Sequence, residues 1–195
     1  MNSLLQEVIL SHVPFLSQRD LKVAEKSFSL QKLKKGDIFL KDGDVATKVA
    51  FVNKGILVNI FPSTEKGNIV TGITPEGKFT TVGKSFLTQT PSDEMIMAIE
   101  DCEILVITNE QVQEIYLKNK NLERAARFIF EAHKVFQNLK VRWFVERNAL
   151  KRYEAFAEYS PAIVERVPQY MIASYLGITP ESLSRLIANR KTKAK

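Results

Sequence analysis

The sequence predicts an α+β chain with three parts: an antiparallel β-roll of the double-stranded β-helix or jelly-roll type, a long helix, and a small all-α helix-turn-helix domain. Three observations support this prediction. Short apolar runs alternate with turn signals as far as residue 108, a stretch without Gly or Pro then extends to Pro161, and a helix-turn-helix pattern lies near the C-terminus. We therefore divide the chain into residues 1–118, 119–150 and 151–195.

The composition is that of an ordinary globular protein, because 45% of the 195 residues are hydrophobic and 26% are charged. No apolar run approaches the roughly 20 residues that span a bilayer, and the N-terminus has no positively charged leader. We therefore expect a soluble, cytoplasmic protein that does not enter a membrane. Cys102, His12 and His133 are the only cysteine and histidines. Neither an intrachain disulfide nor a four-cysteine zinc or iron–sulfur site can be built from them, and two histidines do not make a His-rich metal site within one chain, so no metal is expected.

The positive charge is concentrated in the last quarter of the chain. From residue 147 onward there are nine Lys or Arg against four Glu, a local net charge of +5, whereas the formal charge of the whole chain is +6. A basic end favours an anionic partner, and nucleic acid is the first candidate. A solvated basic tail is an equally good alternative on charge alone.

Residues 1–29 are predicted to form short amphipathic helices, interrupted at Pro14, that cap the following domain. Between residues 30 and 108 the apolar runs are separated by glycine-containing turn motifs such as Asn53-Lys54-Gly55. Regular spacing of this kind is typical of antiparallel strands in a sandwich or roll. Residues alternate along runs such as 56–61, so that each strand has a face to bury.

The stretch 119–150 is predicted to be one long helix. Apolar side chains recur along it at alternating intervals of three and four residues, which is the spacing of a heptad seam, with one break at Glu146. The seam positions that we assign to a dimer interface are Leu122, Ala125, Ile129, Ala132, Phe136, Leu139 and Trp143. A second apolar stripe runs through Phe128, Val135, Val145 and Ala149. Because one stripe can pack on the roll while the other meets a second copy, we expect a homodimer; a helix that only packs on its own sheet is the alternative.

The segment 169–188 fits the helix-turn-helix pattern at its constrained positions. Ala173 is the small residue that lets two helices cross closely, and Gly177 stands at the turn, where a positive φ is needed. Thr179 is a good N-cap and Pro180 a good first helical residue, so a second helix is expected to begin there. An amphipathic helical hairpin without any role in DNA binding is the alternative, and the basic tail weighs against it.

Such a second helix can enter the major groove and contact base edges and phosphates. Arg185 is the candidate for a bidentate contact to guanine, and Glu181 can accept a hydrogen bond from a cytosine amino group. The expected DNA contacts are Gln169, Thr179, Glu181, Ser182, Ser184, Arg185, Asn189, Arg190 and Lys191. The sequence contains no phosphate-binding loop, dinucleotide-binding glycine motif or nucleophile motif, so no enzymatic activity is expected.

With these parts assembled, the chain resembles the Crp/Fnr family of transcription regulators, which includes the cyclic-AMP receptor protein, over nearly its whole length. Residues 38–61 resemble paired β-roll strands of the family, and GITPESLSRL resembles its recognition helix. The resemblance implies a homodimer that binds double-stranded DNA sequence-specifically, with RNA polymerase as a further partner. It also implies that Glu181 and Arg185 read bases. The additional Arg that the family has directly before this Glu falls on Pro180 and is absent.

The expected effector site departs from the family pattern. In cyclic-nucleotide-binding relatives a short helix after a Gly-Glu turn meets the ribose and phosphate, and a later Arg neutralises the phosphate. Here Val82 stands at the Glu position, and residues 77–99 contain no Arg. Ser92, Asp93 and Glu94 occupy the phosphate-facing region, where a carboxylate repels a phosphate. We therefore expect an unidentified small-molecule effector rather than cyclic AMP. Its pocket is assigned to Phe79, Thr81, Val82, Gly83, Lys84 and Ser85.

The expected DNA-binding domain lacks room for the C-terminal wing of many family members, and Lys191, Lys193 and Lys195 can replace the phosphate contacts of that wing. A disordered, solvated tail is the alternative for these lysines. Two other functions compete with a DNA-binding regulator. One is a small-molecule-binding sensory module that acts through protein partners and has a degenerate DNA-binding domain. The other is an enzyme on a cupin-like β-fold, for which the sequence lacks metal ligands and a nucleophile with its base.

Overall fold

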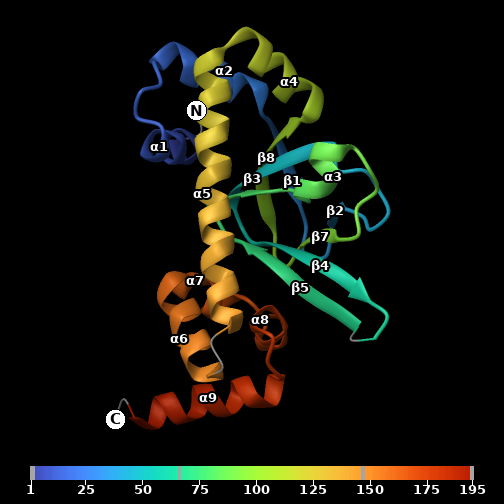
Figure 1. Cartoon of the computed structure of the whole chain (residues 1–195), viewed down its shortest axis with the longest axis vertical. Coiled ribbons are helices and arrows are strands. Elements are labelled where there is room, and N and C mark those ends of the chain that lie inside the picture. Colours follow the sequence, from blue (N-terminus) through green and yellow to red (C-terminus); the bar gives the residue numbers. More distant parts are fainter. Residues whose placement is uncertain (1–2, 66, 146–147, 194–195) are drawn as a thin grey trace.

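The computed structural model describes residues 3–65, 67–145 and 148–193, without the side chains of residues 3, 136–140, 142–143, 159 and 189–193. Two antiparallel sheets pack face to face, with helices at both ends and along one side (Figure 1). The predicted α+β class and antiparallel roll are therefore confirmed. Within the described ranges, no helix is long and apolar enough to cross a bilayer.

The strands of the described residues form two four-stranded sheets, one with the order β1-β8-β3-β6 and the other with the order β2-β7-β4-β5. Alternate residues along β3 point to opposite sides: Ala50 and Val52 enter the core between the sheets, whereas Phe51 faces the N-terminal helices. The strands are β1 (Ser29–Leu33), β2 (Ile38–Leu40), β3 (Lys48–Lys54), β4 (Leu57–Ser63), β5 (Gly67–Thr74), β6 (Phe79–Thr80), β7 (Met95–Ala98) and β8 (Cys102–Thr108).

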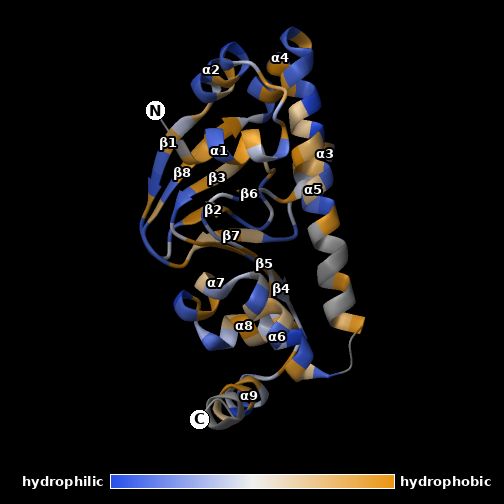
Figure 2. Cartoon of the chain, turned by 90° about the vertical axis from the view of Figure 1, so that its left-hand side faces the viewer, coloured by the Kyte–Doolittle hydropathy of each residue, from blue (hydrophilic) through white to orange (hydrophobic). Residues whose placement is uncertain are grey.

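Helices cap one end of the roll and continue along its side (Figures 1 and 2). As predicted, two short helices precede the strands; together with α4 they cover one end, and α5 leads from this cap along the roll. The helices are α1 (Ser3–His12), α2 (Gln18–Ser27), the short α3 (Gly83–Thr88), α4 (Asn109–Lys118) and α5 (Lys120–Val145). The apolar side chains of α1 and α2 pack against Phe51 and Leu105 of the sheet and Leu122 of α5.

The long helix ends earlier than the sequence pattern predicted. α5 stops at Val145, and Asn148 begins a new helix, α6 (Ala149–Tyr159), because its side chain accepts a hydrogen bond from the backbone N–H of Leu150 at 2.9 Å. Ala149, which was assigned to the second apolar stripe of the long helix, therefore belongs to the next helix.

The C-terminal helices pack beneath the outer face of β4 and β5 (Figure 2). They are α6, α7 (Pro161–Arg166), α8 (Gln169–Leu176) and α9 (Pro180–Lys193). Val58, Val70 and Ile73 from the strands share one buried apolar cluster with Phe156 of α6 and Ile172 of α8. The C-terminal domain is thus joined to the roll by a continuous core as well as by the chain.

Candidate nucleic-acid interface, helix face and effector region

The turn between α8 and α9 has the geometry of a helix-turn-helix. Ala173 has no exposed surface, which allows the two helices to approach closely. Gly177 has φ +64° and ends α8, with its N–H bonded to the Ala173 and Ser174 carbonyls. The Ile178 N–H also reaches the Ala173 carbonyl, at 3.0 Å. Ala173 at the helix crossing and Gly177 at the turn therefore have the positions that the sequence pattern predicted.

Helix α9 is capped and oriented as the pattern predicted. The Thr179 hydroxyl accepts a hydrogen bond from the Ser182 N–H at 3.2 Å and donates one to the Ser182 hydroxyl at 3.0 Å. Leu183 is fully buried, and Leu186 and Ile187 are half-buried. One side of α9 is therefore fixed against the rest of the domain, and its opposite side is left for solvent or a ligand.

The exposed side of α9 carries the polar residues expected to contact DNA. Ser182, Ser184 and Arg185 are exposed, as are Thr179 and Glu181 at the start of the helix. The helix lies across the end of the molecule that is remote from α1 and α2 (Figure 1). Gln169 is exposed in the first turn of α8. The side chains of Asn189, Arg190 and Lys191 lie outside the described residues.

Among its described side chains, the exposed side of α9 carries one acidic and one basic group, Glu181 and Arg185. Hydrogen bonds from its own backbone N–H and from the Thr179 side chain hold the pKa of Glu181 below its ordinary value, with a smaller effect of Arg185. Glu181 is therefore ionised at neutral pH and acts only as an acceptor. Arg185, one helical turn later, forms no ion pair with any described residue.

The beginning of α5 does not present the predicted seam to a partner. Leu122 and Ala125 are only 6% and 3% exposed, because they pack in the core beneath α1 and α2, and Ile129 packs against the same cluster. The structure corrects the prediction here: the first seam positions are covered by their own chain. Ala132 is half-buried. The side chains of three further seam positions lie outside the described residues, namely Phe136, Leu139 and Trp143.

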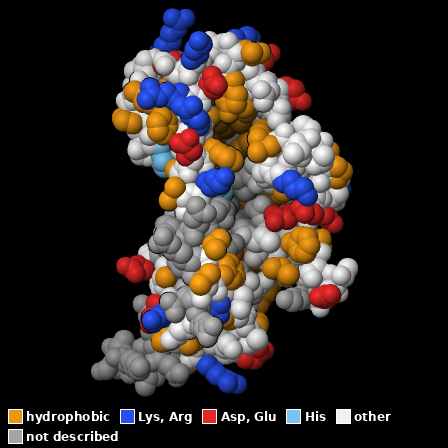
Figure 3. Space-filling view, in the orientation of Figure 1, with side chains coloured by type: hydrophobic (Ala, Val, Ile, Leu, Met, Phe, Trp, Pro, Cys, Tyr) orange, Lys and Arg blue, Asp and Glu red, His pale blue; other side chains and the backbone are white. Residues whose placement is uncertain are grey.

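A different face of α5 exposes large apolar side chains. Phe130, Val141 and Phe144 are 53%, 58% and 46% exposed. These three residues belong to the series 130, 134, 137, 141 and 144. Its steps alternate between four and three residues, so all five positions share one face of the helix. Figure 3 shows exposed hydrophobic side chains on the side of the molecule along which α5 runs. The sequence pattern did not predict this face of the helix, because apolar residues fill only three of its five positions.

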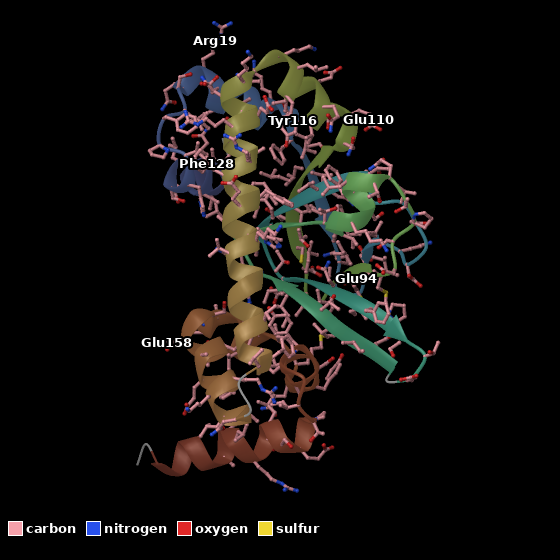
Figure 4. All side chains as sticks on the ribbon, viewed as in Figure 1. Arg19, Glu94, Glu110, Tyr116, Phe128 and Glu158 are labelled. Atoms are coloured by element: carbon pink, nitrogen blue, oxygen red, sulfur yellow. The ribbon has the colours of Figure 1, made fainter. Side chains whose placement is uncertain are left out.

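The second predicted stripe is also exposed, but it is not continuous. Phe128 has a partner in its own chain, since its ring lies 6.2 Å from the Phe15 ring and the Arg124 guanidinium stacks over Phe15 at 4.3 Å (Figure 4). Val135 and Val145 are 61% and 74% exposed. They stand almost three helical turns apart, so they do not form a tight seam by themselves.

The six residues assigned to an effector pocket occupy different environments. Phe79 is the clearest correction: its ring lies 4.9 Å from Phe51 beneath the N-terminal helices, on the opposite side of the sheet from the roll interior. Val82 is buried in the core between the sheets. Gly83 begins α3, which is only six residues long. Lys84 is exposed, with its Nζ 3.9 Å from a carboxylate oxygen of Asp93.

The hydroxyl groups of this region bond to backbone. Ser85 accepts a hydrogen bond from the Ala46 N–H at 2.8 Å and donates to the Thr90 carbonyl at 2.5 Å. Thr81 donates to the Lys48 carbonyl at 2.9 Å. These bonds hold the connections of the roll together, so neither hydroxyl group stands ready for a phosphate.

The polar side chains inside the roll are different ones, which sequence reasoning missed. Thr80 donates a hydrogen bond to the Asn59 side-chain oxygen at 3.2 Å, and the Asn59 amide donates to a Glu94 carboxylate oxygen at 3.3 Å. Asn59 and Thr80 are 7% and 6% exposed. The alternation of side chains along a strand could have predicted this, because Asn59 follows the inward-facing Leu57 by two residues and therefore points to the same side. Ser92 turns its hydroxyl to the Glu94 carbonyl, at 2.7 Å.

Other reactive groups form no site in the described part of the chain. No group of three or more His, Cys, Asp or Glu residues there is placed to hold a metal ion. Cys102 is buried, and burial raises the pKa of its thiol. A thiol of this kind is inert at neutral pH.

Comparisons with known proteins agree with this architecture. Residues 30–119 match the family model of the cyclic nucleotide-binding domain. No curated protein matches the sequence significantly. The structure of FixK2 from Bradyrhizobium japonicum is 12% identical, with a TM-score of 0.71 and 86% of each chain covered. The c-di-GMP responsive global regulator CLP from Xanthomonas campestris is 14% identical, with a TM-score of 0.69, 89% of this chain and 91% of that chain covered.

A Eubacterium rectale protein described as a transcriptional regulator of the Crp/Fnr family has the same architecture. It is 18% identical, with a TM-score of 0.66, and the match covers 91% of this chain and 85% of that one. At such identities the likeness establishes a common fold. The resemblance to Crp/Fnr regulators that the sequence motifs indicated is confirmed at this level, and residues 30–119 form a domain of the cyclic nucleotide-binding type.

Proposed function

We propose that this chain, whose β-roll is a domain of the cyclic nucleotide-binding type, is a transcription regulator that binds double-stranded DNA sequence-specifically as a homodimer. One observation carries the proposal. Helix α9 follows a tight, glycine-centred turn, buries Leu183 against its own domain, and leaves Glu181, Ser184 and Arg185 exposed at the end of the molecule. A helix with this surface fits the major groove.

The proposed reading residues have complementary chemistry. Arg185 carries a guanidinium group that can bond to both acceptor atoms of guanine, and Glu181 can accept from a cytosine amino group. Ser182 and Ser184 are short enough to let the helix backbone approach the bases or phosphates. Because Arg185 has no ion pair among the described residues, no ion pair with any of them has to be broken before it meets DNA.

The proposed dimer interface is the α5 face that carries Phe130, Val141 and Phe144. These large apolar side chains are 46–58% exposed, and a second copy of the same face would cover them. The helical cap of the roll and α9 lie at opposite ends of α5 (Figure 1). A parallel two-fold pairing therefore brings both copies of α9 to the same end, where they can meet one duplex.

We also propose that the roll does not bind cyclic AMP. The Val82 side chain offers no hydrogen bond, residues 77–99 contain no Arg, and the carboxylate of Glu94 points to the Asn59 amide within the roll. These residues do not fit a cyclic phosphate, which needs a cation or several N–H donors. Titration calorimetry with cyclic AMP should show no saturable heat at micromolar concentration. A submicromolar dissociation constant would overturn this part of the proposal. Contact with RNA polymerase and a cytoplasmic location stay predictions.

DNA binding is tested with duplexes selected from a random pool by the wild-type protein. On the selected sequence, Arg185→Ala should cost about 1–3 kcal/mol per half-site and relax the preference at one symmetric base position. Arg19→Ala is the matched control, since Arg19 is exposed and lies at the opposite end of the molecule (Figure 4). It removes the same charge without touching α9 and should leave both affinity and preference unchanged.

Two outcomes contradict the proposal in different ways. If Arg185→Ala weakens binding but leaves every base preference intact, Arg185 contacts phosphate and the reading face is assigned wrongly. If the wild type prefers no duplex over random DNA, the chain is a sensory module that acts through protein partners.

A further inference from the structure

Two connections of the roll converge on one side chain of the C-terminal domain. Arg166, the last residue of α7, donates hydrogen bonds to both carboxylate oxygens of Glu76, at 2.9 and 2.7 Å. It also bonds to the carboxylate of Glu100. Glu76 lies between β5 and β6, and Glu100 lies between β7 and β8. We call the three side chains the Arg166 clasp.

Glu76 is also bonded within the roll. It accepts a further hydrogen bond from the Gly55 N–H at 2.8 Å. Only glycine fits at position 55, because its φ is +97° and an added Cβ would lie 2.5 Å from the Cys102 sulfur. The carboxylate that receives the guanidinium group is therefore oriented by a backbone bond of the roll as well as by Arg166.

Glu76 and Arg166 remain ionised throughout the physiological pH range. Burial opposes ionisation of Glu76, but the hydrogen bonds from Arg166 and the backbone outweigh it and hold the pKa of Glu76 below its ordinary value. Hydrogen bonds to Glu76 and then Glu100 raise the pKa of Arg166 further. The side chains of Arg166 and Glu76 are 34% and 31% exposed. At this exposure an ion pair adds little to stability. The apolar cluster between the roll and the C-terminal helices therefore contributes most of the stability of the contact between the two domains.

The apolar cluster does not by itself fix the orientation of the C-terminal domain relative to the roll. Apolar burial does not depend on orientation, whereas a two-pronged guanidinium–carboxylate pair fixes an angle as well as a distance. A second directional bond joins the same two domains, from the Val70 N–H on β5 to the Ser174 hydroxyl on α8, at 2.9 Å. Two such bonds at separate places define how the C-terminal domain is rotated against the roll.

We propose that Arg166 is a positioning residue for DNA recognition: through its clasp on Glu76 and Glu100 it sets the angle of α9 relative to the roll, and hence the spacing of the two recognition helices. This inference rests on the proposed function, because spacing matters only if two helices meet one duplex. A dimer gains affinity from its second half-site only when both helices reach successive grooves together. A single half-site makes no such demand.

The test compares one duplex with both half-sites and one with a single half-site, each taken from the wild-type selection. Arg166→Gln should weaken binding to the full site about tenfold, which corresponds to about 1.4 kcal/mol, and leave binding to the single half-site unchanged. The variant should also tolerate one added or removed base pair between half-sites better than the wild type. Arg166→Lys keeps the charge but not the two-pronged geometry, so it should recover only part of the loss.

Controls separate the clasp from general effects. Lys34→Gln breaks an ion pair of similar length, 2.7 Å to Asp101, that lies within the roll, and it should change neither affinity. Glu100→Gln weakens the clasp by removing the charge of one of its two carboxylates. This variant is used in the same test if the Arg166→Gln protein does not fold. Equal loss on full and single half-sites, or no loss on either, would overturn the inference while the proposed function stands. A wild type that selects no duplex would instead overturn the proposed function.

Discussion

The two ends of α5 are built differently, although the sequence pattern is continuous between them. At the N-terminal end Leu122 and Ala125 are buried by their own chain, and the neighbouring Asn119 side chain donates to the Asp20 carboxylate at 2.7 Å. Toward the C-terminal end Val141 and Phe144 are 58% and 46% exposed. The N-terminal end of α5 therefore anchors the cap of the roll, whereas the C-terminal end exposes large apolar side chains to which we propose that a second copy binds.

The largest expected effect comes from charge on the exposed face. Val141→Asp should convert the proposed dimer to a monomer, because each buried, unpaired carboxylate costs several kcal/mol. Sedimentation velocity over a concentration series measures this. Val135→Asp is the matched control, since Val135 is equally exposed but lies about 120° away around the helix axis. If only the Val135 variant dissociates, the second predicted stripe is the interface.

At the buried end the expected effect is on folding rather than on association. Leu122→Ala should lower the free energy of unfolding by about 2–5 kcal/mol, because it leaves a cavity beneath α1 and α2. Denaturant titration measures the change. Leu117→Ala, at a residue that is 87% exposed, should change it by less than about 0.5 kcal/mol. Similar losses in the two variants would mean that the buried end is not packed as described.

Asp20 should make the same end sensitive to acid. Hydrogen bonds from Asn119 and Ser17 lower the pKa of Asp20 from 3.8 to about 2. A lowered folded-state pKa stabilises the protein above the unfolded value, and this contribution is lost as the pH falls from about 4 to about 2. Asp20→Asn should therefore reduce stability at neutral pH by on the order of 2 kcal/mol and flatten the acid dependence.

Denaturant unfolding at a series of pH values tests this prediction. The exposed Asp42 provides the control, and Asp42→Asn should follow the wild-type curve. Wild-type and Asp20→Asn curves that run parallel down to the lowest pH would show that Asp20 does not anchor the cap electrostatically.

The smallest effect is expected where the exposed end of α5 meets the helix-turn-helix. At Gly177 the φ is +64°, and an added Cβ would lie 3.1 Å from the Phe144 ring. Gly177→Ala should therefore cost about 1 kcal/mol in thermal or denaturant unfolding. Gly83→Ala is the control, because no atom lies within 4 Å of the added Cβ and φ is not positive. It should be neutral or slightly stabilising, and an equal cost at both glycines would contradict the account of the turn.

The parts that sequence reasoning predicted well depend on local chemistry. A positive φ at Gly177, a cap at Thr179 and a small residue at Ala173 are each required within one short segment. The alternating runs and turns likewise led to the antiparallel roll. Such constraints act over a few residues, so their pattern is visible in the sequence.

The parts that it missed depend on contacts between distant residues. Whether Leu122 faces its own cap or a partner is decided by α1 and α2, which the heptad spacing does not encode. Phe79 was assigned to a pocket, but its place on β6 turns it to the Phe51 side of the sheet. Arg166 and Glu76 are 90 residues apart, and neither belongs to a recognisable motif.

Footprinting tests most directly whether two copies of α9 read one duplex together, as we propose. The wild-type protein is footprinted on duplexes that it selected from a random pool. We expect a pseudo-palindromic site whose half-sites are one helical turn, about 34 Å, apart, each half protected equally. Selection of a single half-site, or of half-sites without a fixed spacing, would contradict it.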